Sequence, residues 1–477
     1  MAKAGSTGFK KAMSIQFASK YLNVIIQLLL TAILARLLTP EEYGVVAVVV
    51  LFTSFFTLLS DMGLGPAIVQ FRELRETDFS ALFTFSCIFG ACLALVFCAV
   101  AHPISVFYGK SELYGLLMLA SVAIFFNAVN MVPNGLLLRE KKFLAIGVRL
   151  IVSTCSAGVV AVAMALCGFG AVSLIVQSIV SSIVVFAWNF FSSGLKIGNR
   201  HFVAPVKTVL SYSLFQFGFS TVNFFSRNLD NILIGKVLGT TSLGFYDKAY
   251  KLSTYPISFL AGVVGSVLQP YLAKYQDQPD ILYLHWLKVA KALSLIAMPI
   301  ALVCFCCSEE VIILFFGEQW HESVPLFQAL SVSMYFQIVN NPAGPIFQSA
   351  KKTNYMFFHS LLATGITTMC LIIGLFSENI LTVSFCISIA YCLHTGSIAY
   401  FLVKKTLGQS IANYFGNFVL EVGIALLVGA AYVLFWPQLG LGLVPSFLIK
   451  ASVILLVVIS AYAISGQLNQ IKALIKK

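Results

Sequence analysis

Apolar segments long enough to cross a membrane follow one another along this chain, and two of them carry polar side chains at the same spacing. Steps of four, three, four and four residues separate the polar positions of the first segment, which are Gln16, Lys20, Asn23, Gln27 and Thr31. The same steps recur 200 residues later at Gln216, Ser220, Asn223, Arg227 and Asn231. Such steps place each set on one face of a helix. Polar side chains inside a membrane face a bundle interior or a watery cavity, so the two stripes indicate a transport pathway built from two copies of one module.

Shorter matches in the same chain order extend this duplication. Residues 37–44 align with 237–244, residues 107–109 align with 315–317, and the Pro-x-Gly at 133–135 aligns with the Pro-x-Gly at 342–344. The offset drifts from 200 to 209 along the chain, as insertions in loops would make it drift. We interpret the matches as an ancient duplication.

Hydropathy predicts an all-α polytopic membrane protein with about fourteen transmembrane helices, each near the length that a bilayer requires. The expected spans are 12–36, 43–64, 79–101, 113–137, 144–166, 171–192, 209–235, 243–270, 286–307, 323–347, 354–376, 380–403, 415–436 and 444–464. Loops rich in Lys and Arg alternate with loops that are poor in them, Lys110 being the clearest exception. By the positive-inside rule, both termini are expected in the cytoplasm.

The repeat predicts the domain organisation. It begins at the first and again at the seventh span, and this even separation gives both copies the same orientation in the membrane. We therefore expect two parallel six-helix repeats, related by a pseudo-twofold axis along the membrane normal, around a central cavity. The expected boundaries are 1–200 for the N-terminal lobe, 201–408 for the C-terminal lobe and 409–477 for two additional helices and a cytoplasmic tail.

Composition agrees with this class and excludes others. Hydrophobic residues make up 59% of the 477 residues and charged residues only 10%, whereas soluble domains carry about 25% charged residues. The net charge of +12 comes from basic residues in short loops, so it is a topology signal and no nucleic-acid partner is expected. The eleven cysteines lie in apolar stretches, and Cys304 and Cys307 have no second pair beside them. We expect no metal and no cofactor.

Four segments resemble the polysaccharide transport family of the MOP flippase superfamily, and in particular its Wzx-type exporters related to those for colanic and teichuronic acids. The segments are ARLLTPEEYG at 35–44, DMGLGPAIVQ at 61–70, DNILIG at 230–235 and FGEQW at 316–320. The resemblance implies translocation of a polyprenyl-diphosphate-linked oligosaccharide from the cytoplasmic to the periplasmic leaflet. It also implies the bacterial inner membrane as location, and a polysaccharide polymerase and glycosyltransferases of the same pathway as partners.

The polar stripes suit such a substrate. A diphosphate, hydroxyls and uronic acids require cationic and amide side chains in a sheltered groove. The predicted substrate-binding residues are therefore Gln16, Lys20, Asn23, Gln27, Gln216, Asn223, Arg227, Asp230, Lys248 and Lys251.

Several charged positions have a structural alternative. Arg227 and Asp230 are three residues apart on a helix, and an ion pair that lets the helix insert is the alternative to a substrate contact. For Lys248 and Lys251 the alternative is an interfacial cluster near the start of a span. Five further charges lie near predicted span edges and are interpreted as anchors: Arg149, Lys288, Lys291, Lys450 and Glu421.

Two other functions are weighed against the flippase. A cation-coupled small-molecule or drug antiporter of the same superfamily would favour twelve spans and a cavity in which carboxylates are the main charged groups. A membrane glycosyltransferase or polymerase would need a sizeable extramembrane loop with acidic catalytic residues, and the sequence contains none. The Gly109-Lys110-Ser111 segment lacks the glycine that a P-loop requires five residues earlier. No catalytic residue is therefore predicted, and the protein is not expected to be an enzyme.

Overall fold

The computed structural model describes residues 2–61, 75–195, 227–435 and 442–467, together with 68, 221, 224 and 225. Side chains are described for these residues except 2–15, 17, 61, 76, 261–267, 270, 433 and 435. The described elements are all helices, with no strand among them, so the predicted all-α class is confirmed. The chain divides into two compact units, Met1–Gly244 and Phe245–Lys477.

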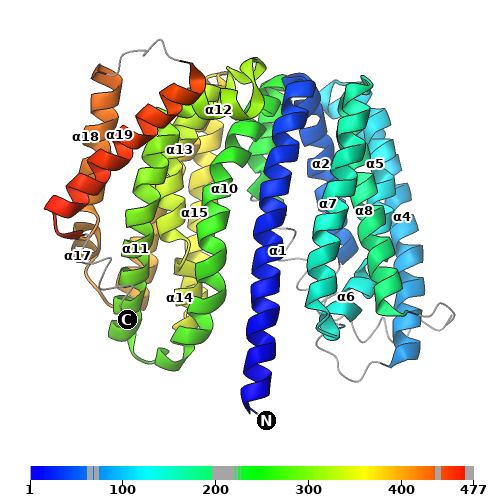
Figure 1. Cartoon of the computed structure of the whole chain (residues 1–477), viewed down its shortest axis with the longest axis horizontal. Coiled ribbons are helices and arrows are strands. Elements are labelled where there is room, and N and C mark those ends of the chain that lie inside the picture. The colour runs from blue at the N-terminus through cyan, green and yellow to red at the C-terminus, as the bar shows by residue number, and fades with distance from the viewer. Residues whose placement is uncertain are drawn as a thin grey trace. The chain divides into compact units, whose positions relative to one another are not determined.

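The first unit is a bundle of long helices (Figure 1). In it, α5 packs against α2, α4 and α8, while α7 packs against α1 and α8. The helices of this unit are α1 (Ala2–Leu37), α2 (Pro40–Asp61), α4 (Glu76–Tyr108), α5 (Glu112–Val129), α6 (Met131–Arg139), α7 (Phe143–Leu166) and α8 (Ala171–Ser193).

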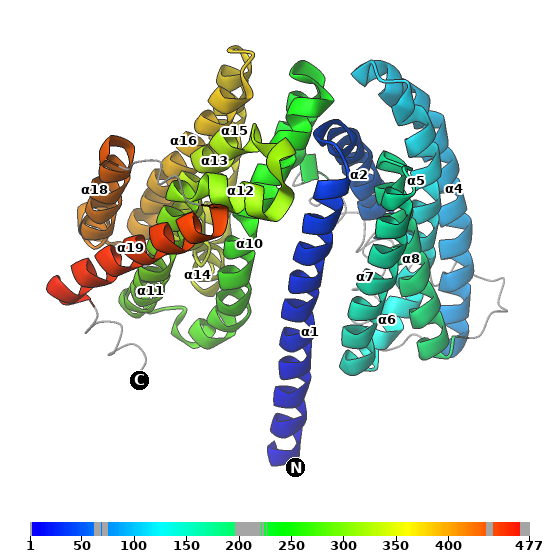
Figure 2. The same ribbon diagram turned by 45° about the horizontal axis from the view of Figure 1, so that its top comes forward.

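The second unit has more breaks in its helices (Figure 2). Here α13 packs against α11 and α16, and α15 packs against α16. After α10 (Gly239–Leu272), which begins in the first unit, the helices are η1 (Ala273–Tyr275), α11 (Pro279–Cys306), α12 (Ser308–Phe316), η2 (Glu318–Trp320), α13 (Ser323–Asn340), α14 (Ala343–Ser349), α15 (Thr353–Leu375), α16 (Ile380–Ile398), the π-helix η3 (Ala399–Thr406), α17 (Ile411–Gly416), α18 (Val419–Phe435) and α19 (Leu443–Ile464).

Ten stretches of the described residues are long and apolar enough to cross a membrane, so the chain is a multi-pass membrane protein. They correspond to ten of the fourteen predicted spans. Of the other four, the span predicted at 209–235 lies largely outside the described residues. The spans at 243–270, 323–347 and 415–436 correspond to the long helix α10, to α13 with α14, and to the 17-residue helix α18.

The motif at 35–44 contains the start of α2, and side chains of the motif cap that helix. The Thr39 backbone N–H donates to the Glu42 carboxylate at 2.7 Å, and the Glu42 N–H donates to the Thr39 hydroxyl at 3.3 Å. This reciprocal pair is a capping box, with Pro40 at the first helical position, where a missing N–H costs nothing. The turn between α1 and α2 is thereby fixed by local hydrogen bonds.

Helices α2 and α10 begin against each other in the first unit. A Cβ at Gly44 would lie 1.7 Å from the backbone oxygen of Thr240, and a Cβ at Gly244 would lie 2.1 Å from that of Pro40. The backbones approach so closely that only glycine fits at either position. The contact is reciprocal, since Gly44 and Gly244, like Pro40 and Thr240, are 200 residues apart.

Each unit also contains a helix that breaks in the same way, at the two Pro-x-Gly segments. The spans predicted as continuous at 113–137 and 323–347 are divided into α5 and α6, and into α13 and α14. Two residues after the end of each short second helix, a lysine lies in the left-handed region, Lys141 with φ 57° and Lys351 with φ 56°. The same backbone hydrogen bonds close both turns, as in Lys142 N–H to Leu137 O and Lys352 N–H to Phe347 O.

Candidate substrate site

The first polar stripe lies along α1, with its side chains in different environments. Lys20 and Gln27 are exposed and Gln16 is half-buried. Asn23 is only 6% exposed, and its Oδ1 accepts a hydrogen bond of 2.6 Å from the Thr154 hydroxyl of α7. In this structure Asn23 therefore joins two helices, while Lys20 and Gln27 are the members that are free to meet a ligand.

The second stripe is described only in part. Gln216 and Asn223 lie outside the described residues. Arg227 is exposed and belongs to none of the ion pairs that the described residues form. The Asp230 carboxylate accepts a hydrogen bond of 2.8 Å from the backbone N–H of Asn231. The described geometry thus leaves the Arg227 guanidinium available.

The two predicted lysines of α10 differ sharply from each other. Lys251 is exposed and pairs with Asp247 at 2.8 Å, one helical turn away. Lys248 is 3% exposed, and its ammonium lies 5.8 Å from the ring centres of both Phe316 and Trp320. A cation over two aromatic faces is stabilised by their quadrupoles, which gives Lys248 a packing role in this conformation.

Two buried ion pairs hold the C-terminal helices to the second unit. Glu421 of α18 is fully buried and pairs with Lys291 of α11 at 2.5 Å. Lys450 of α19 pairs with Glu310 of α12 at 2.5 Å, and the same carboxylate accepts from the Ser446 hydroxyl at 2.6 Å. The interpretation of Lys291, Glu421 and Lys450 as anchors at span edges is therefore wrong.

The sequence analysis missed these pairs for a physical reason. Each joins residues more than a hundred positions apart, and periodicity reports only neighbours on one helix. A signal was nevertheless present, because Lys291, Glu421 and Lys450 are charged residues inside apolar runs, where an unpaired charge is costly.

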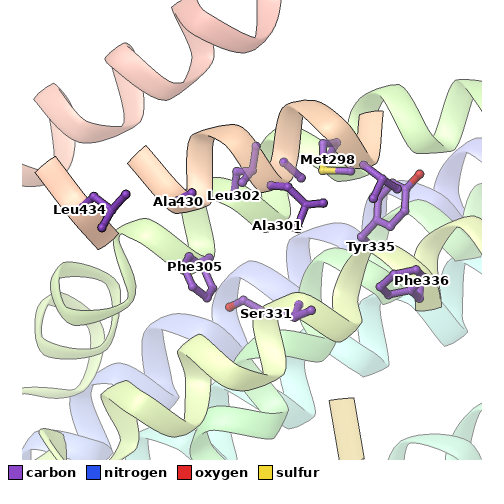
Figure 3. Close-up of a pocket in the computed structure, with 14 residues that line it drawn as sticks. Met298, Ala301, Leu302, Phe305, Ser331, Tyr335, Phe336, Ala430 and Leu434 are labelled. Atoms are coloured by element: carbon purple, nitrogen blue, oxygen red, sulfur yellow. The ribbon is translucent and has the colours of Figure 1, made fainter. Parts of the chain in front are cut away.

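An apolar groove of about 600 Å³ lies between α11, α13 and α18 (Figure 3). Met298, Leu302 and Phe305 line it from α11, and Tyr335 and Phe336 line it from α13. On the opposite side, α18 contributes small residues, among them Gly429 and Ala430. The Tyr335 hydroxyl pairs with Ser294 at 2.8 Å, so the groove presents almost pure hydrocarbon. Such a surface suits an alkyl or isoprenoid chain and not a sugar.

The predicted site residues are shared between the two units. The described ones in α1 and in the helical stretch 227–237 belong to the first unit, and Lys248 and Lys251 belong to the second. Their convergence on one cavity stays a prediction. Among the described residues, no group of three or more His, Cys, Asp or Glu side chains has the geometry to hold a metal ion.

The fold defines the class of protein. The lipid II flippase MurJ, in an inward closed conformation, aligns with a TM-score of 0.73 at 14% identity, over 95% of this chain and 98% of that chain. An inward-facing multidrug resistance MATE family transporter of the MOP superfamily aligns with a TM-score of 0.61 at 15% identity, over 88% of this chain and 99% of that one. The chain is thus a multi-pass membrane protein with the fold of the MOP superfamily.

Sequence comparison identifies the family. Residues 33–325 match the family described as "Polysaccharide biosynthesis protein", and because this is more than half of the chain, the chain belongs to that family. Teichuronic acid biosynthesis protein TuaB of Bacillus subtilis is 24% identical over 70% of this chain and 70% of its own length. Succinoglycan biosynthesis transport protein ExoT of Rhizobium meliloti is 27% identical over 70% of this chain and 68% of its own length. The family resemblance read from the sequence motifs is confirmed.

Proposed function

We propose that this chain is a flippase that moves a polyprenyl-diphosphate-linked oligosaccharide from the cytoplasmic to the periplasmic leaflet by alternating access. Membership of the polysaccharide biosynthesis family supports the substrate class, and the names of one relative and of two structural neighbours refer to transport or flipping. The observation that carries the proposal is the set of exposed polar side chains on α1 and 227–237, because the Lys20 and Arg227 cations match the charge of a diphosphate and the Gln27 amide can donate hydrogen bonds to it.

The lipid tail has a separate place in this proposal. A polyprenyl chain is insoluble in water, so it must stay in hydrocarbon while the head group crosses. The groove between α11, α13 and α18 offers an apolar surface beside the second unit. We assign the tail to this groove, with the ion pair of Glu421 holding its α18 wall in place and the ion pair of Lys450 holding the neighbouring α19. The assignment gives the two additional helices a function.

We infer fourteen spans in two parallel repeats from the topology and from recurring local geometry. The reciprocal contact of Gly44 and Gly244 and the matching turns at Lys141 and Lys351 support the duplication. The charge alternation of the loops supports cytoplasmic termini in the bacterial inner membrane. The glycosyltransferases that build the oligosaccharide and the polymerase that consumes it are the proposed partners, and the chain itself is proposed to have no catalytic activity.

A drug antiporter on the same scaffold is the second candidate, and the MATE-like fold favours it. The two candidates differ in the charge of the substrate. Among the site residues predicted from the sequence, cations outnumber carboxylates, since Lys20, Arg227, Lys248 and Lys251 stand against Asp230. A cationic drug would be repelled by such a set, whereas an anionic lipid would be attracted.

Substitution of Arg227 tests the flippase directly in cells that make the polysaccharide. A charge-assisted hydrogen bond contributes about 1.5–3 kcal/mol, so Arg227→Ala should reduce export by about 10- to 100-fold while the chain still inserts. Arg227→Lys should retain part of the export, because it keeps the charge but loses the bidentate geometry. Export is measured as surface polysaccharide, and insertion as the amount of chain in membranes.

Lys352→Ala is the matched control, since Lys352 is an exposed cation in a loop. Unchanged export by Arg227→Ala would remove Arg227 from the site. Loss of both insertion and export would instead assign Arg227 a structural role.

A further inference from the structure

Equivalent helices of the two units carry a basic side chain at the same position. Arg149 is the seventh residue of α7, which begins at Phe143, and His359 is the seventh residue of α15, which begins at Thr353. Both helices follow the same lysine turn, at Lys141 and at Lys351. The two side chains therefore occupy corresponding places in the duplicated fold.

Their hydrogen-bond partners correspond as well. The Arg149 guanidinium donates at 2.8 Å to Asn189 of α8 and at 2.8 Å to Asn134 of α6. The Nδ1 of His359 bonds to the Ser397 hydroxyl of α16 at 2.8 Å. Asn189 is the nineteenth residue of α8 and Ser397 the eighteenth of α16. One unit thus holds a permanent cation where the other holds a side chain that can gain or lose a proton.

A second histidine lies about one helical turn, roughly 5.4 Å, further along the interface of α15 and α16. The Nε2 of His394 lies 3.0 Å from the backbone oxygen of Ala363 and 3.1 Å from the Thr367 hydroxyl. A carbonyl oxygen only accepts hydrogen bonds, so Nε2 carries the hydrogen of the neutral ring. Nδ1 is then the basic nitrogen, and it forms no hydrogen bond to the residues that the structure describes.

The pair can take up a proton without losing a hydrogen bond. A hydroxyl both donates and accepts, so Ser397 stays bonded to His359 whether Nδ1 carries a hydrogen or not. The His394 bond to Ala363 is likewise unchanged when Nδ1 gains a proton. Both rings are half-buried, and that of His359 is stacked on Phe347 with its centre 6.1 Å away. Because Arg149 keeps a charge at the corresponding place, the fold tolerates a cation there.

The groups around the two rings include no nearby acid. Among residues 323–406, all of which the structure describes, the single carboxylate is Glu378, in the turn after α15. The other titratable groups of these elements are Tyr335 of α13, Tyr355 and Cys370 of α15, Cys386, Tyr391 and Cys392 of α16, and Tyr400, Lys404 and Lys405 of η3. None of these groups is a carboxylate that would keep the imidazoles protonated. The charge of the histidines is therefore free to change with the pH.

The histidines are connected to α10, which carries the predicted substrate lysines. The Tyr391 ring meets that of His394 edge to face, with their centres 5.3 Å apart, and the Tyr391 hydroxyl lies 3.5 Å from that of Tyr250 in α10. Tyr250 is adjacent in sequence to Lys251. Directly after Ser397 the chain forms the π-helix η3, an irregularity that is frequent at functional sites.

We propose that His359 and His394 form a proton-binding site that couples the conformation of the second unit to the pH gradient. This inference rests on the proposed function and names its driving ion. A proton from one aqueous side forms an N–H bond at a free ring nitrogen, and it leaves by the same bond to the other side. The positive charge on the imidazoles changes the contacts of α16 and, through Tyr391 and Tyr250, those of α10.

Hydrogen–deuterium exchange of the full chain tests the site without any substrate. The chain is placed in nanodiscs of phosphatidylethanolamine and phosphatidylglycerol, and labelled at about pH 5.5 and about pH 8, which lie on either side of the pKa of an unperturbed histidine. Labelling times are scaled to correct for the pH dependence of the exchange rate of an unprotected amide. In the wild type, the corrected exchange rates of peptides from α15, α16 and α10 should differ several-fold between the two pH values.

Two substitutions of His359 give opposite predictions. His359→Arg copies the permanent charge of Arg149 and should give the acidic pattern at both pH values, while His359→Gln should give the alkaline pattern at both. His394→Gln should reduce the pH difference, and Tyr391→Phe should abolish it in α10 but not in α15. His321→Gln, at an exposed histidine, and Arg149→Gln are the controls, and both should retain the wild-type difference.

The proposal is overturned if the wild type shows no pH difference, or if His359→Gln and His394→Gln both retain it. Because the measurement needs no glycan, its failure would leave the flippase proposal standing. Conversely, a chain that fails to flip lipid-linked sugars would still show the exchange pattern if the proton site is real.

Discussion

Gly44 and Gly244 are the residues at which a single added carbon has the most predictable effect. Gly44→Ala places a Cβ 1.7 Å from the Thr240 backbone oxygen, and backbone cannot move aside as a side chain can. We expect the variant to lose about 1–3 kcal/mol or more of stability, the cost of overpacking. Thermal unfolding of the purified chain in detergent measures the loss.

Gly115→Ala is the matched control in the same unit, because a Cβ there meets nothing within 4 Å. Alanine is the better helix former, so this variant should be as stable as the wild type or more stable. Equal stability of Gly44→Ala and Gly115→Ala would contradict the close crossing of α2 and α10.

The Lys291–Glu421 pair allows a second prediction at the residue scale. Glu421→Gln leaves the Lys291 ammonium buried without a counter-charge, which should destabilise the chain by about 3–5 kcal/mol. Replacing both residues by leucine should cost less than the single substitution, since no charge is then left unpaired. Glu140→Gln, which breaks the exposed pair with Lys142, should cost about 0–1 kcal/mol. Thermal unfolding of the three variants would refute the pairing if Glu421→Gln and Glu140→Gln behaved alike.

At the scale of elements, the wall of the apolar groove formed by α18 can be tested by filling it. Gly429→Trp places an indole in the space assigned to the polyprenyl tail, and we expect it to reduce polysaccharide export severalfold while the chain still inserts. Leu427→Trp is the control on the same helix, since Leu427 is 74% exposed and does not line the groove. Equal export by the two variants would show that the tail does not bind there.

The sequence predicts these elements well where a single physical rule applies. Ten predicted spans coincide with long apolar helices, because an apolar run of bilayer length has few alternatives to a helix. The breaks before α6 and α14 were not predicted, although Pro133 and Pro342 are signals for them, since proline lacks the N–H that would bond to the carbonyl of the preceding turn. Apolarity alone does not distinguish a broken helix from a continuous one.

The site is predicted less completely, because the pattern gives a face of a helix but not its neighbour. The stripe of α1 places Asn23 beside Lys20, yet Asn23 bonds to Thr154 of α7 while Lys20 is exposed. Likewise, the sequence marks Lys248 as a cation near a helix start, but the rings of Phe316 and Trp320 that cover it come from distant segments. Tertiary contacts of this kind require the structure.

At the scale of the whole molecule, the structure accounts for the one loop that departs from the charge alternation. The Lys110 ammonium donates to the Glu41 carboxylate at 2.6 Å, across the turn that follows α4. This hydrogen bond raises the pKa of Lys110, so the side chain stays charged and the pair is neutral overall. The pair gives Lys110 a structural role, and one lysine in this loop is outnumbered by the Lys and Arg residues of the loops that set the predicted topology.

The leaflet occupied by the lipid-linked oligosaccharide tests the central claim most directly. Cells depleted of the chain, with the glycosyltransferases of the pathway intact, are treated with periodate, which oxidises sugars but does not cross the membrane. The flippase account predicts that the lipid-linked unit accumulates and stays protected, whereas cells with the wild-type chain expose it to oxidation. Oxidation of the accumulated unit in the depleted cells would contradict the account, because the oligosaccharide would have crossed without this protein.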